Sequence, residues 1–343
     1  MVAGSRLHNC WPTALAGVAG GYLASLAGWP LPWMVGSLLA VITLRCVTGQ
    51  PFTELPGGRR VGQWLIASGI GLHFTSEVLE QVLNHLWVIL PTALCPLLIS
   101  VIGITLLHRS GIDRATAFFS SMPGGASEMV VLGLRHGAQP SLVAAAHSMR
   151  LLLVVLLVPA LFTWSLPDVS APAPLPVDWA WLAPLLLAGA ALGWLWRLLK
   201  QPNPWMLGPL IACALASASF DLHLTLPGEL GKLGQWLIGC ALGCHFDRSF
   251  FRQAPAYLGR VLLSTLLAML GAVLIGELLA WLAGLDHLSL ILGMMPGGIA
   301  ELSLTAEALQ LSVALVTALQ VLRLFLVMFL AEPLFRYWNR KPS

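Results

Sequence analysis

The heptapeptide Met122-Pro123-Gly124-Gly125-Ala126-Ser127-Glu128 returns later in this chain with the same residue at five of its seven positions. Its second copy is Met295-Pro296-Gly297-Gly298-Ile299-Ala300-Glu301, which lies 173 residues further on (296 − 123). Other blocks return at an offset of 172 (204 − 32): Pro32-Trp33-Met34 as Pro204-Trp205-Met206, Gly62-Gln63-Trp64 as Gly234-Gln235-Trp236, and His73-Phe74 as His245-Phe246. Chance matches would scatter, so a nearly constant offset across separate blocks indicates a tandem duplication.

The composition places this duplicated chain in a lipid bilayer. Of its 343 residues, 57% are hydrophobic and only 10% are charged, and the mean hydropathy is +0.82. A soluble domain carries about 25% charged residues, so most of this surface cannot face water. The net charge of +3 is modest, and no polar stretch is long enough for a DNA-reading module. We therefore expect an integral membrane protein with no nucleic-acid partner.

Ten apolar stretches approach the length of about 20 residues that a membrane-spanning helix needs. They lie at 11–27, 32–48, 61–79, 85–107 and 140–164, and then at 179–196, 204–220, 233–247, 256–283 and 311–335. The first stretch follows Arg6 as a secretory signal would, but its counterpart in the second half favours a retained helix. We predict an all-α polytopic membrane protein with two membrane repeats, at 1–165 and 179–343, joined by a Pro-rich linker at 166–178.

The basic residues orient the predicted helices, because Lys and Arg near helix ends lie mainly on the cytoplasmic side. In the first half they follow the second and fourth stretches, whereas in the second half they follow the first, third and fifth. The basic loops of one half thus correspond to poorly charged loops of the other. This alternation predicts two inverted repeats of about five transmembrane helices, each with a Pro-Gly-Gly broken or re-entrant hairpin, and cytoplasmic termini.

The Pro-Gly-Gly segments are candidate binding sites. Proline removes a backbone donor and glycine permits conformations that a helix cannot hold. In a membrane, the freed backbone groups need protein or a watery cavity around them, and a helix that starts after the break points its positive end at that cavity. The candidate residues are Pro123, Gly124 and Gly125 with Pro296, Gly297 and Gly298, near the bilayer centre, where an anion would fit. A packing kink is the alternative.

Glu128 and Glu301 follow the last glycine of each copy by three residues. A carboxylate in the first turn of a helix complements the positive end of the helix dipole, which is a structural role. A carboxylate beside a cavity also serves to couple transport to an ion or a proton. The two roles are compatible, and the sequence leaves both open.

Arg150 and Arg323 also correspond (323 − 150 = 173), and Arg150 lies ten residues beyond Pro140. At ~1.5 Å per residue it is about 15 Å into its helix. A guanidinium at that depth costs at least ~2.5–3.5 kcal/mol unless it is paired or hydrated. We expect Glu128 or Glu301 as its partner. The arginines then act either as links between hairpin and helix or as ligands of a substrate carboxylate.

His147 lies one helical turn before Arg150, and Gln320 takes the same place before Arg323. Both side chains can hydrogen-bond into a cavity, and His147 can also carry a proton. The six cysteines and nine histidines show no metal-ligand spacing. We therefore expect no metal, no cofactor and no catalytic residue.

The repeated blocks P-W-M-x-G, G-Q-W-L-I and M-P-G-G-x-x-E resemble the AbrB family of bacterial inner-membrane proteins over essentially the whole chain. This family shares only its name with a small DNA-binding transition-state regulator. Its members are labelled as regulators of gene expression or as ammonia monooxygenases. The resemblance implies a location in a bacterial inner membrane. It also implies a relationship to cation–proton antiporters and anion carriers with inverted five-helix repeats.

Two functions from different classes follow. The first is a secondary transporter of a small, anionic solute, with ion or proton coupling at Glu128 and Glu301. The second is a membrane-embedded regulator of gene expression that acts indirectly, through a ligand or a partner. A copper monooxygenase needs clustered imidazoles, which the scattered histidines do not supply, so we expect no enzyme. The sequence leaves the substrate, the coupling ion and the oligomeric state open, and a homo-oligomer is compatible with it.

Overall fold

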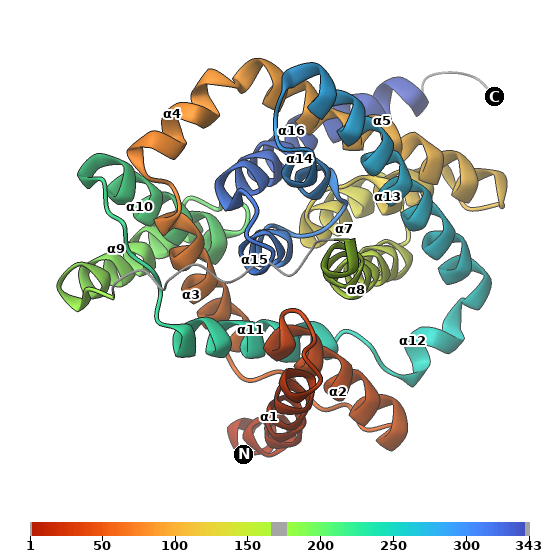
Figure 1. Cartoon of the computed structure of the whole chain (residues 1–343). Coiled ribbons are helices and arrows are strands. Elements are labelled where there is room, and N and C mark those ends of the chain that lie inside the picture. Colours follow the sequence, from red (N-terminus) through yellow and green to blue (C-terminus); the bar gives the residue numbers. More distant parts are fainter. Residues whose placement is uncertain (1, 166–176, 340–343) are drawn as a thin grey trace. The chain divides into compact units, whose positions relative to one another are not determined.

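The computed structural model describes residues 2–165 and 177–339, and all regular structure in these ranges is helical (Figure 1). Ten helices lie at the ten predicted stretches: α1 (Val2–Leu26), α2 (Pro32–Thr48), α3 (Gly58–Leu72), α5 (Leu86–Arg109), α8 (Pro140–Ser165), α9 (Trp179–Leu198), α10 (Pro204–Phe220), α11 (Gly228–Gly243), α13 (Pro255–Ala283) and α16 (Val313–Asn339). Six shorter helices lie between them: α4 (Ser76–Asn84), α6 (Arg114–Ser121), α7 (Ala126–Arg135), α12 (Arg248–Gln253), α14 (His287–Met294) and α15 (Ile299–Ala308). The predicted linker lies outside the described residues, apart from residues 177 and 178.

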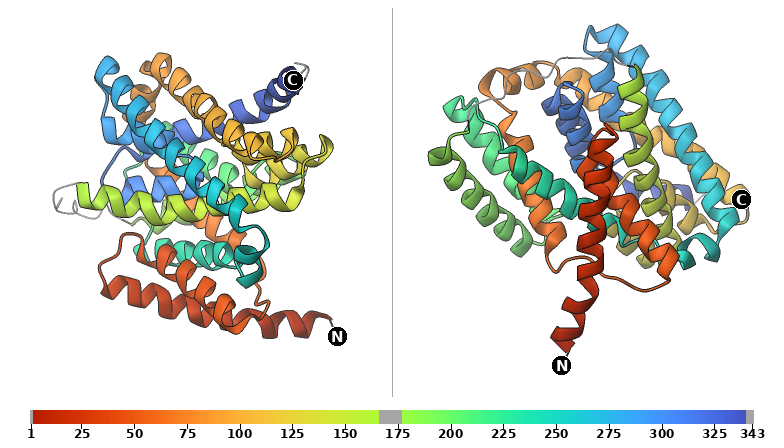
Figure 2. Two further views of the ribbon diagram at one scale, coloured as in Figure 1. Left: turned by 90° about the vertical axis from the view of Figure 1, so that its right-hand side faces the viewer. Right: turned by 60° about the horizontal axis from the view of Figure 1, so that its bottom comes forward.

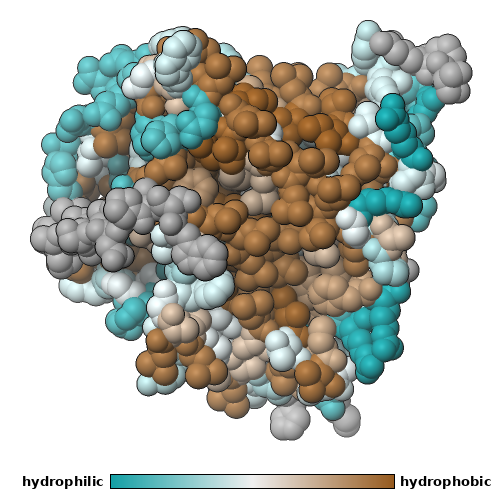
Figure 3. Space-filling view, turned by 45° about the vertical axis from the view of Figure 1, so that its right-hand side comes forward, coloured by the Kyte–Doolittle hydropathy of each residue, from teal (hydrophilic) through white to brown (hydrophobic). Residues whose placement is uncertain are grey.

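Five of the described helices, α5, α8, α9, α13 and α16, are long and apolar enough to cross a membrane. α2 and α10 are also apolar but have 17 residues each, which is about 25 Å at ~1.5 Å per residue. Large apolar side chains are exposed on these helices, including Leu98, Leu187, Trp281 and Phe329, and Figure 3 shows a broad apolar area on one face. The prediction of a helical membrane protein is confirmed, whereas the count of ten crossings stays a prediction.

The repeated Pro-Trp pair marks the start of a helix in both halves. α2 begins at Pro32 and α10 at Pro204, each after a residue in the left-handed region, Leu31 (φ 51°) and Asn203 (φ 45°). Proline suits the first helical position because its missing N–H would have no partner there. The same local chemistry therefore starts both helices.

The chain forms two compact units, and each unit combines segments from both halves of the sequence. Unit 1 comprises Met1–Gln81, Pro159–Phe251 and Glu307–Ala314, and unit 2 comprises Val82–Val158, Arg252–Ala306 and Leu315–Ser343. The first three helices of each half thus fall in unit 1, and the helices around each Pro-Gly-Gly segment fall in unit 2. The two sequence repeats are a different division of the chain, and their boundaries stay a prediction.

Unit 1 contains the same helix contacts twice. α1 packs along α2 (Figure 2), and α9 packs along α10 in the same way. α3 of the first half contacts α10 of the second, where Gly71 lies against Cys213. α11 of the second half contacts α2 of the first, where Gly243 lies against Val41. Gly243 and Val41 are the equivalents of Gly71 and Cys213 at the 172-residue offset, with the two halves of the chain exchanged. An interface with two-fold symmetry produces the same pattern.

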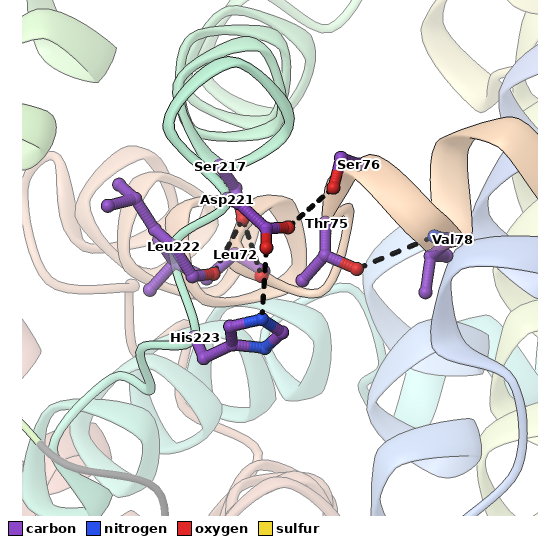
Figure 4. A network of polar contacts seen from close by, with 8 residues as sticks. All are labelled: Leu72, Thr75, Ser76, Val78, Ser217, Asp221, Leu222 and His223. Carbon is purple, nitrogen blue, oxygen red and sulfur yellow. Dashed lines mark hydrogen bonds and ion pairs between the residues drawn. The ribbon is translucent and has the colours of Figure 1, made fainter.

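A polar network joins the ends of α3 and α10 within unit 1 (Figure 4). The Ser217 hydroxyl lies 3.1 Å from the carbonyl oxygens of Leu72 and Leu222, to which it donates. The Ser76 hydroxyl donates to the Asp221 carboxylate at 2.5 Å. The buried Ser217 hydroxyl therefore has backbone carbonyls of the chain as its hydrogen-bond partners.

Unit 2 has two apolar clusters, and α16 contributes to both. One cluster joins α5, α6, α7 and α8 to α16, and its aromatic centre is formed by Phe118, Phe119 and Phe335. The other joins α5, α13 and α14 to α16 around Ile89, Leu290 and Leu319. The last helix of the chain is thus packed against helices of the first half, beside the helices that flank the Pro-Gly-Gly segments.

Candidate functional site

Both Pro-Gly-Gly segments interrupt a helix in unit 2. α6 ends at Ser121 and α7 begins at Ala126, whereas α14 ends at Met294 and α15 begins at Ile299. The two interrupted hairpins also begin alike. Asp113 accepts the backbone N–H of Thr116 at 2.8 Å, and Asp286 accepts that of Ser289 at 2.9 Å. The breaks occur where the sequence predicts them, and whether they are re-entrant in the bilayer stays a prediction.

Unit 2 brings the two breaks together. A Cβ added to Gly124 would lie 2.9 Å from Val327 of α16, and one added to Gly297 would lie 2.7 Å from Val154 of α8. Each break therefore packs closely against the last helix of the other half. Pro123 and Pro296 line the same pocket, so the two interrupted segments share one space.

This pocket has a cavity volume of about 30 Å³, which is room for about one or two water molecules. Its polar lining consists of the Arg150 side chain and five hydroxyl residues, Ser100, Ser120, Ser121, Ser264 and Thr265. The rest of the lining is small or apolar. The pocket therefore offers one cation and several weak hydrogen-bonding groups in an apolar wall.

The five hydroxyl residues were not predicted from the sequence. Ser121 and Ser264 lie in helices and donate to the carbonyls of Ala117 and Val261, so they fit an apolar helix without a distant partner. Ser120 and Ser121 directly precede the first Pro-Gly-Gly block, but the second copy has glycine and methionine in these places. A comparison of the two repeats therefore does not indicate Ser120 or Ser121, whereas Thr265 has an equivalent in Thr92 (265 − 92 = 173), which was a usable signal.

Arg150 and His147 hold the end of α6. Arg150 Nη1 donates to the carbonyls of Met122 (3.1 Å) and Ser121 (3.4 Å). Arg150 Nη2 lies 2.5 Å from His147 Nδ1, and His147 Nε2 lies 3.0 Å from the carbonyl oxygen of Phe119. Because arginine can only donate, Nδ1 accepts and Nε2 carries the hydrogen. The ring is therefore neutral and fully bonded, which does not support the predicted proton-carrying role.

The second half repeats this arrangement with glutamine. Gln320 Nε2 donates to the carbonyls of Gly293 (2.7 Å) and Met295 (3.3 Å). Arg323 donates to the carbonyls of Met295 (2.8 Å) and Gly297 (2.7 Å). The last carbonyls of a helix have no partner within it, and they form the negative end of its dipole. Both arginines thus stabilise the end of the helix that precedes a break.

The expected ion pair between an arginine and Glu128 or Glu301 is wrong. Within the described ranges, Arg150 and Arg323 bond to backbone carbonyls and, for Arg150, to His147, and the ion pairs all lie elsewhere. The physical reason is that the break frees carbonyls directly beside the guanidinium groups. The carboxylates instead turn back onto their own glycines. A Cβ on Gly125 or Gly298 would lie 2.1 Å from Oε2 of the following glutamate.

Neither arginine of this site has an ion pair with a carboxylate among the residues that the structure describes. Arg323 is 5% exposed, and the charge of Arg150 acts on it. Arg323 Nε and Gln320 Oε1 are buried and have no hydrogen-bond partner among the residues that the structure describes. Glu301 is also buried, and Glu128 is half-buried and accepts from the Ser127 hydroxyl at 3.0 Å. Residues 2–165 and 177–339, which the structure describes, contain no group of three or more His, Cys, Asp or Glu side chains that could hold a metal.

The apolar helices define a helical membrane protein, and unit 2 contains a small pocket with a partly polar lining. The chain belongs to the AbrB family, since the family model described as "Transition state regulatory protein AbrB" matches residues 33–339. It is 26% identical over 359 aligned positions to "Uncharacterized protein YhjN" of Bacillus subtilis (strain 168), which covers 96% of this chain and 93% of that protein. It is 27% identical over 318 positions to "Putative regulator AbrB" of Escherichia coli (strain K12), covering 90% of each. The predicted family is confirmed.

Proposed function

We propose that this chain is a secondary transporter whose substrate site is the pocket of unit 2. Its cargo is a small anionic solute, and Glu128 and Glu301 couple transport to a proton or another cation. The observation that carries this proposal is that Pro123 and Pro296, one from each half, line a pocket that also contains Arg150. Transporters with duplicated folds bind substrate where broken helices of the two repeats meet.

The charges around the pocket support an anion as the cargo. Arg150 and Arg323 have no carboxylate partner within the described ranges, and they act on one another as like charges. Buried charges without compensation cost several kcal/mol each, on the order of the desolvation penalty of an ion. α7 and α15 begin directly after the breaks, and helix N-termini attract anions. A bound anion would therefore give a charged partner to guanidinium groups that otherwise bond to backbone carbonyls and to His147.

The carboxylates support coupling. Glu128 and Glu301 lie over the last glycine of each break, in the first turn of α7 and α15. There a change in protonation or a bound cation alters the charge beside the pocket. The inverted relation of the two halves is part of this proposal, because it lets one site open to either side in turn. The exchanged contacts of Gly124 with Val327 and Gly297 with Val154 are those that a two-fold relation produces.

The test begins with an untargeted comparison of metabolites inside and outside cells with and without the protein, which nominates a solute. Flux of that solute into proteoliposomes is then measured with and without a pH gradient. We expect Glu128→Gln, Glu301→Gln, Arg150→Gln and Arg323→Gln each to reduce gradient-driven flux at least tenfold. Lys232→Gln is the control, because Lys232 is exposed and pairs with Glu229 in unit 1. Unchanged flux in all four variants would remove the proposed site.

The inverted arrangement has its own test. Ser110 and Ala283 occupy equivalent positions (283 − 110 = 173), shortly before the Asp residues that cap α6 and α14. Ser110→Cys and Ala283→Cys, in a background without the six native cysteines, should react with a membrane-impermeant thiol reagent from opposite sides of the bilayer. Reaction of both from the same side would contradict the inversion.

A membrane-embedded regulator is the second candidate, and the printed name of the Escherichia coli relative favours it. Among the connections that the structure describes in full, the longest is residues 49–57, which is too short for a DNA-reading module, so this candidate acts on transcription indirectly. This candidate predicts that the solute binds without flux and that one signalling partner co-purifies in stoichiometric amount. Robust flux in proteoliposomes that contain only this chain would decide against it.

A further inference from the structure

A second unusual arginine lies in unit 1. Arg45 is in the last turn of α2 and is 8% exposed. Its Nε and Nη1 atoms are buried and have no hydrogen-bond partner among the residues that the structure describes. Its ion pair with Asp247 spans 3.9 Å between Nη2 and Oδ2, which is longer than a hydrogen bond. A buried donor without a hydrogen-bond partner destabilises the fold, and more so when it is charged.

Asp247 is held in this position by the start of α12. Its Oδ1 atom accepts the backbone N–H of Phe250 at 2.8 Å and the hydroxyl of Ser249 at 2.7 Å. Moving the carboxylate towards Arg45 would break these bonds. The space between the two charges is therefore fixed by the fold, and Arg45 has no second ion pair among the residues that the structure describes.

The other half shows that the fold does not need an arginine here. Ser217 takes the place of Arg45 (217 − 45 = 172), and Thr75 takes that of Asp247 (247 − 75 = 172). Figure 4 shows this equivalent end, where carbonyls of the chain satisfy the Ser217 hydroxyl. The Thr75 hydroxyl accepts the N–H of Val78, as Asp247 accepts that of Phe250. Only the Arg45 end thus contains a buried cation with unused donors.

The surroundings of Arg45 carry further positive charge. Arg45 and Arg59 both act on the ring of His245, and Arg59 and Arg60 act on the carboxylate of Glu54. This part of unit 1 thus contains three arginines, Arg45, Arg59 and Arg60, and two carboxylates, Glu54 and Asp247. This excess charge lies beside a guanidinium whose planar fork is suited to two oxygens of one anion.

We propose that Arg45 is the centre of an anion site in unit 1, which binds a phosphate group through its unused N–H donors. The phosphate belongs either to a phospholipid headgroup or to a small soluble phosphate. A phosphate fits better than a carboxylate, because it offers oxygens beyond the two that the guanidinium fork engages, and these can face Arg59. The site is different from the pocket of unit 2, and it does not depend on transport.

The experiment measures the unfolding temperature of the purified full chain in an uncharged detergent by tryptophan fluorescence. Sodium phosphate is titrated against sodium chloride at equal ionic strength, and phosphatidylglycerol is titrated against phosphatidylcholine. We expect phosphate or phosphatidylglycerol to raise the unfolding temperature of the wild type. The effective probe identifies the source of the phosphate group. An equal effect of chloride, or no effect of either phosphate probe, would overturn the proposal.

Variants of Arg45 test whether the rise in unfolding temperature depends on this residue. Arg45→Met removes the fork and keeps the length of the side chain, so it should lose the response while its own unfolding temperature without ligand stays equal or rises. Arg45→Lys keeps the charge but not the fork, and should need at least tenfold more probe. It serves as the test if Arg45→Met does not fold. Arg248→Gln is the matched control, since Arg248 is an exposed arginine on α12, and it should respond as the wild type does. A wild-type response in both Arg45 variants would also overturn the proposal.

Discussion

The substitution Gly298→Ala tests how closely Glu301 lies on the second break. An added Cβ would stand 2.1 Å from Oε2 and 3.0 Å from Cδ of Glu301. Gly298 is not among the glycines with positive φ, so the clash is with the side chain and the backbone conformation suits alanine. The carboxylate would have to move by roughly 1 Å or more, and Glu301 is 8% exposed. Overpacking at a buried position costs about 1–3 kcal/mol, and we expect that loss in the free energy of unfolding.

The same substitution in the first half provides a comparison. Gly125→Ala would place its Cβ 2.1 Å from Oε2 of Glu128, but Glu128 is only half-buried. Its carboxylate can turn away, at the cost of an altered rotamer of about 0.5–1.5 kcal/mol at most. We therefore expect a smaller loss for Gly125→Ala than for Gly298→Ala, although the two contacts have the same length.

A double-mutant cycle isolates the contact. Unfolding by denaturant is followed by tryptophan fluorescence for the wild type, Gly298→Ala, Glu301→Ala and the double variant. Removing the carboxylate relieves the clash, so Gly298→Ala should cost less in the Glu301→Ala background, with a coupling of about 1–2 kcal/mol. Gly259→Ala is the control, because nothing lies within 4 Å of its added Cβ, and it should be additive with Glu301→Ala. Equal costs of Gly298→Ala in both backgrounds would refute the reasoning.

A further prediction concerns helix packing. Gly36→Ala would place a Cβ 2.2 Å from the Gly20 carbonyl oxygen, so it should destabilise by about 1–3 kcal/mol, whereas Gly259→Ala, in the second turn of α13, should stabilise by up to about 1 kcal/mol. A gain for Gly36→Ala in unfolding by denaturant would contradict the close approach of α1 and α2.

The helices could be predicted because their signals are local. Hydropathy defines the long apolar stretches, Pro32 and Pro204 start α2 and α10, and both Pro-Gly-Gly segments interrupt a helix where proline removes a donor. A repeat offset also identifies Arg150 and Arg323 as a pair. These features depend on neighbouring residues or on the comparison of the two halves, which the sequence displays directly.

The partners of the arginines could not be predicted, because they depend on backbone groups that have no sequence signal. A charge pattern suggests Glu128 for Arg150, but the carboxylate turns back over Gly125 and the carbonyl of Met122 takes its place. Ser264 could not be predicted to line the pocket, because it lies within a largely apolar helix. The grouping of helices from both halves into each unit arises from tertiary contacts, to which the composition of a single helix gives no clue.

The contribution of α16 to both clusters of unit 2 has a consequence for biosynthesis. Phe335 lies against Phe118 and Phe119, more than 200 residues earlier in the chain (335 − 119 = 216). While the ribosome is still producing the second half, the aromatic side chains of α6 have no native neighbour from α16. The early helices are therefore inserted separately and remain incompletely packed until α16 has been synthesised. Truncation of that final helix should leave the earlier segments inserted but exposed to quality-control proteolysis.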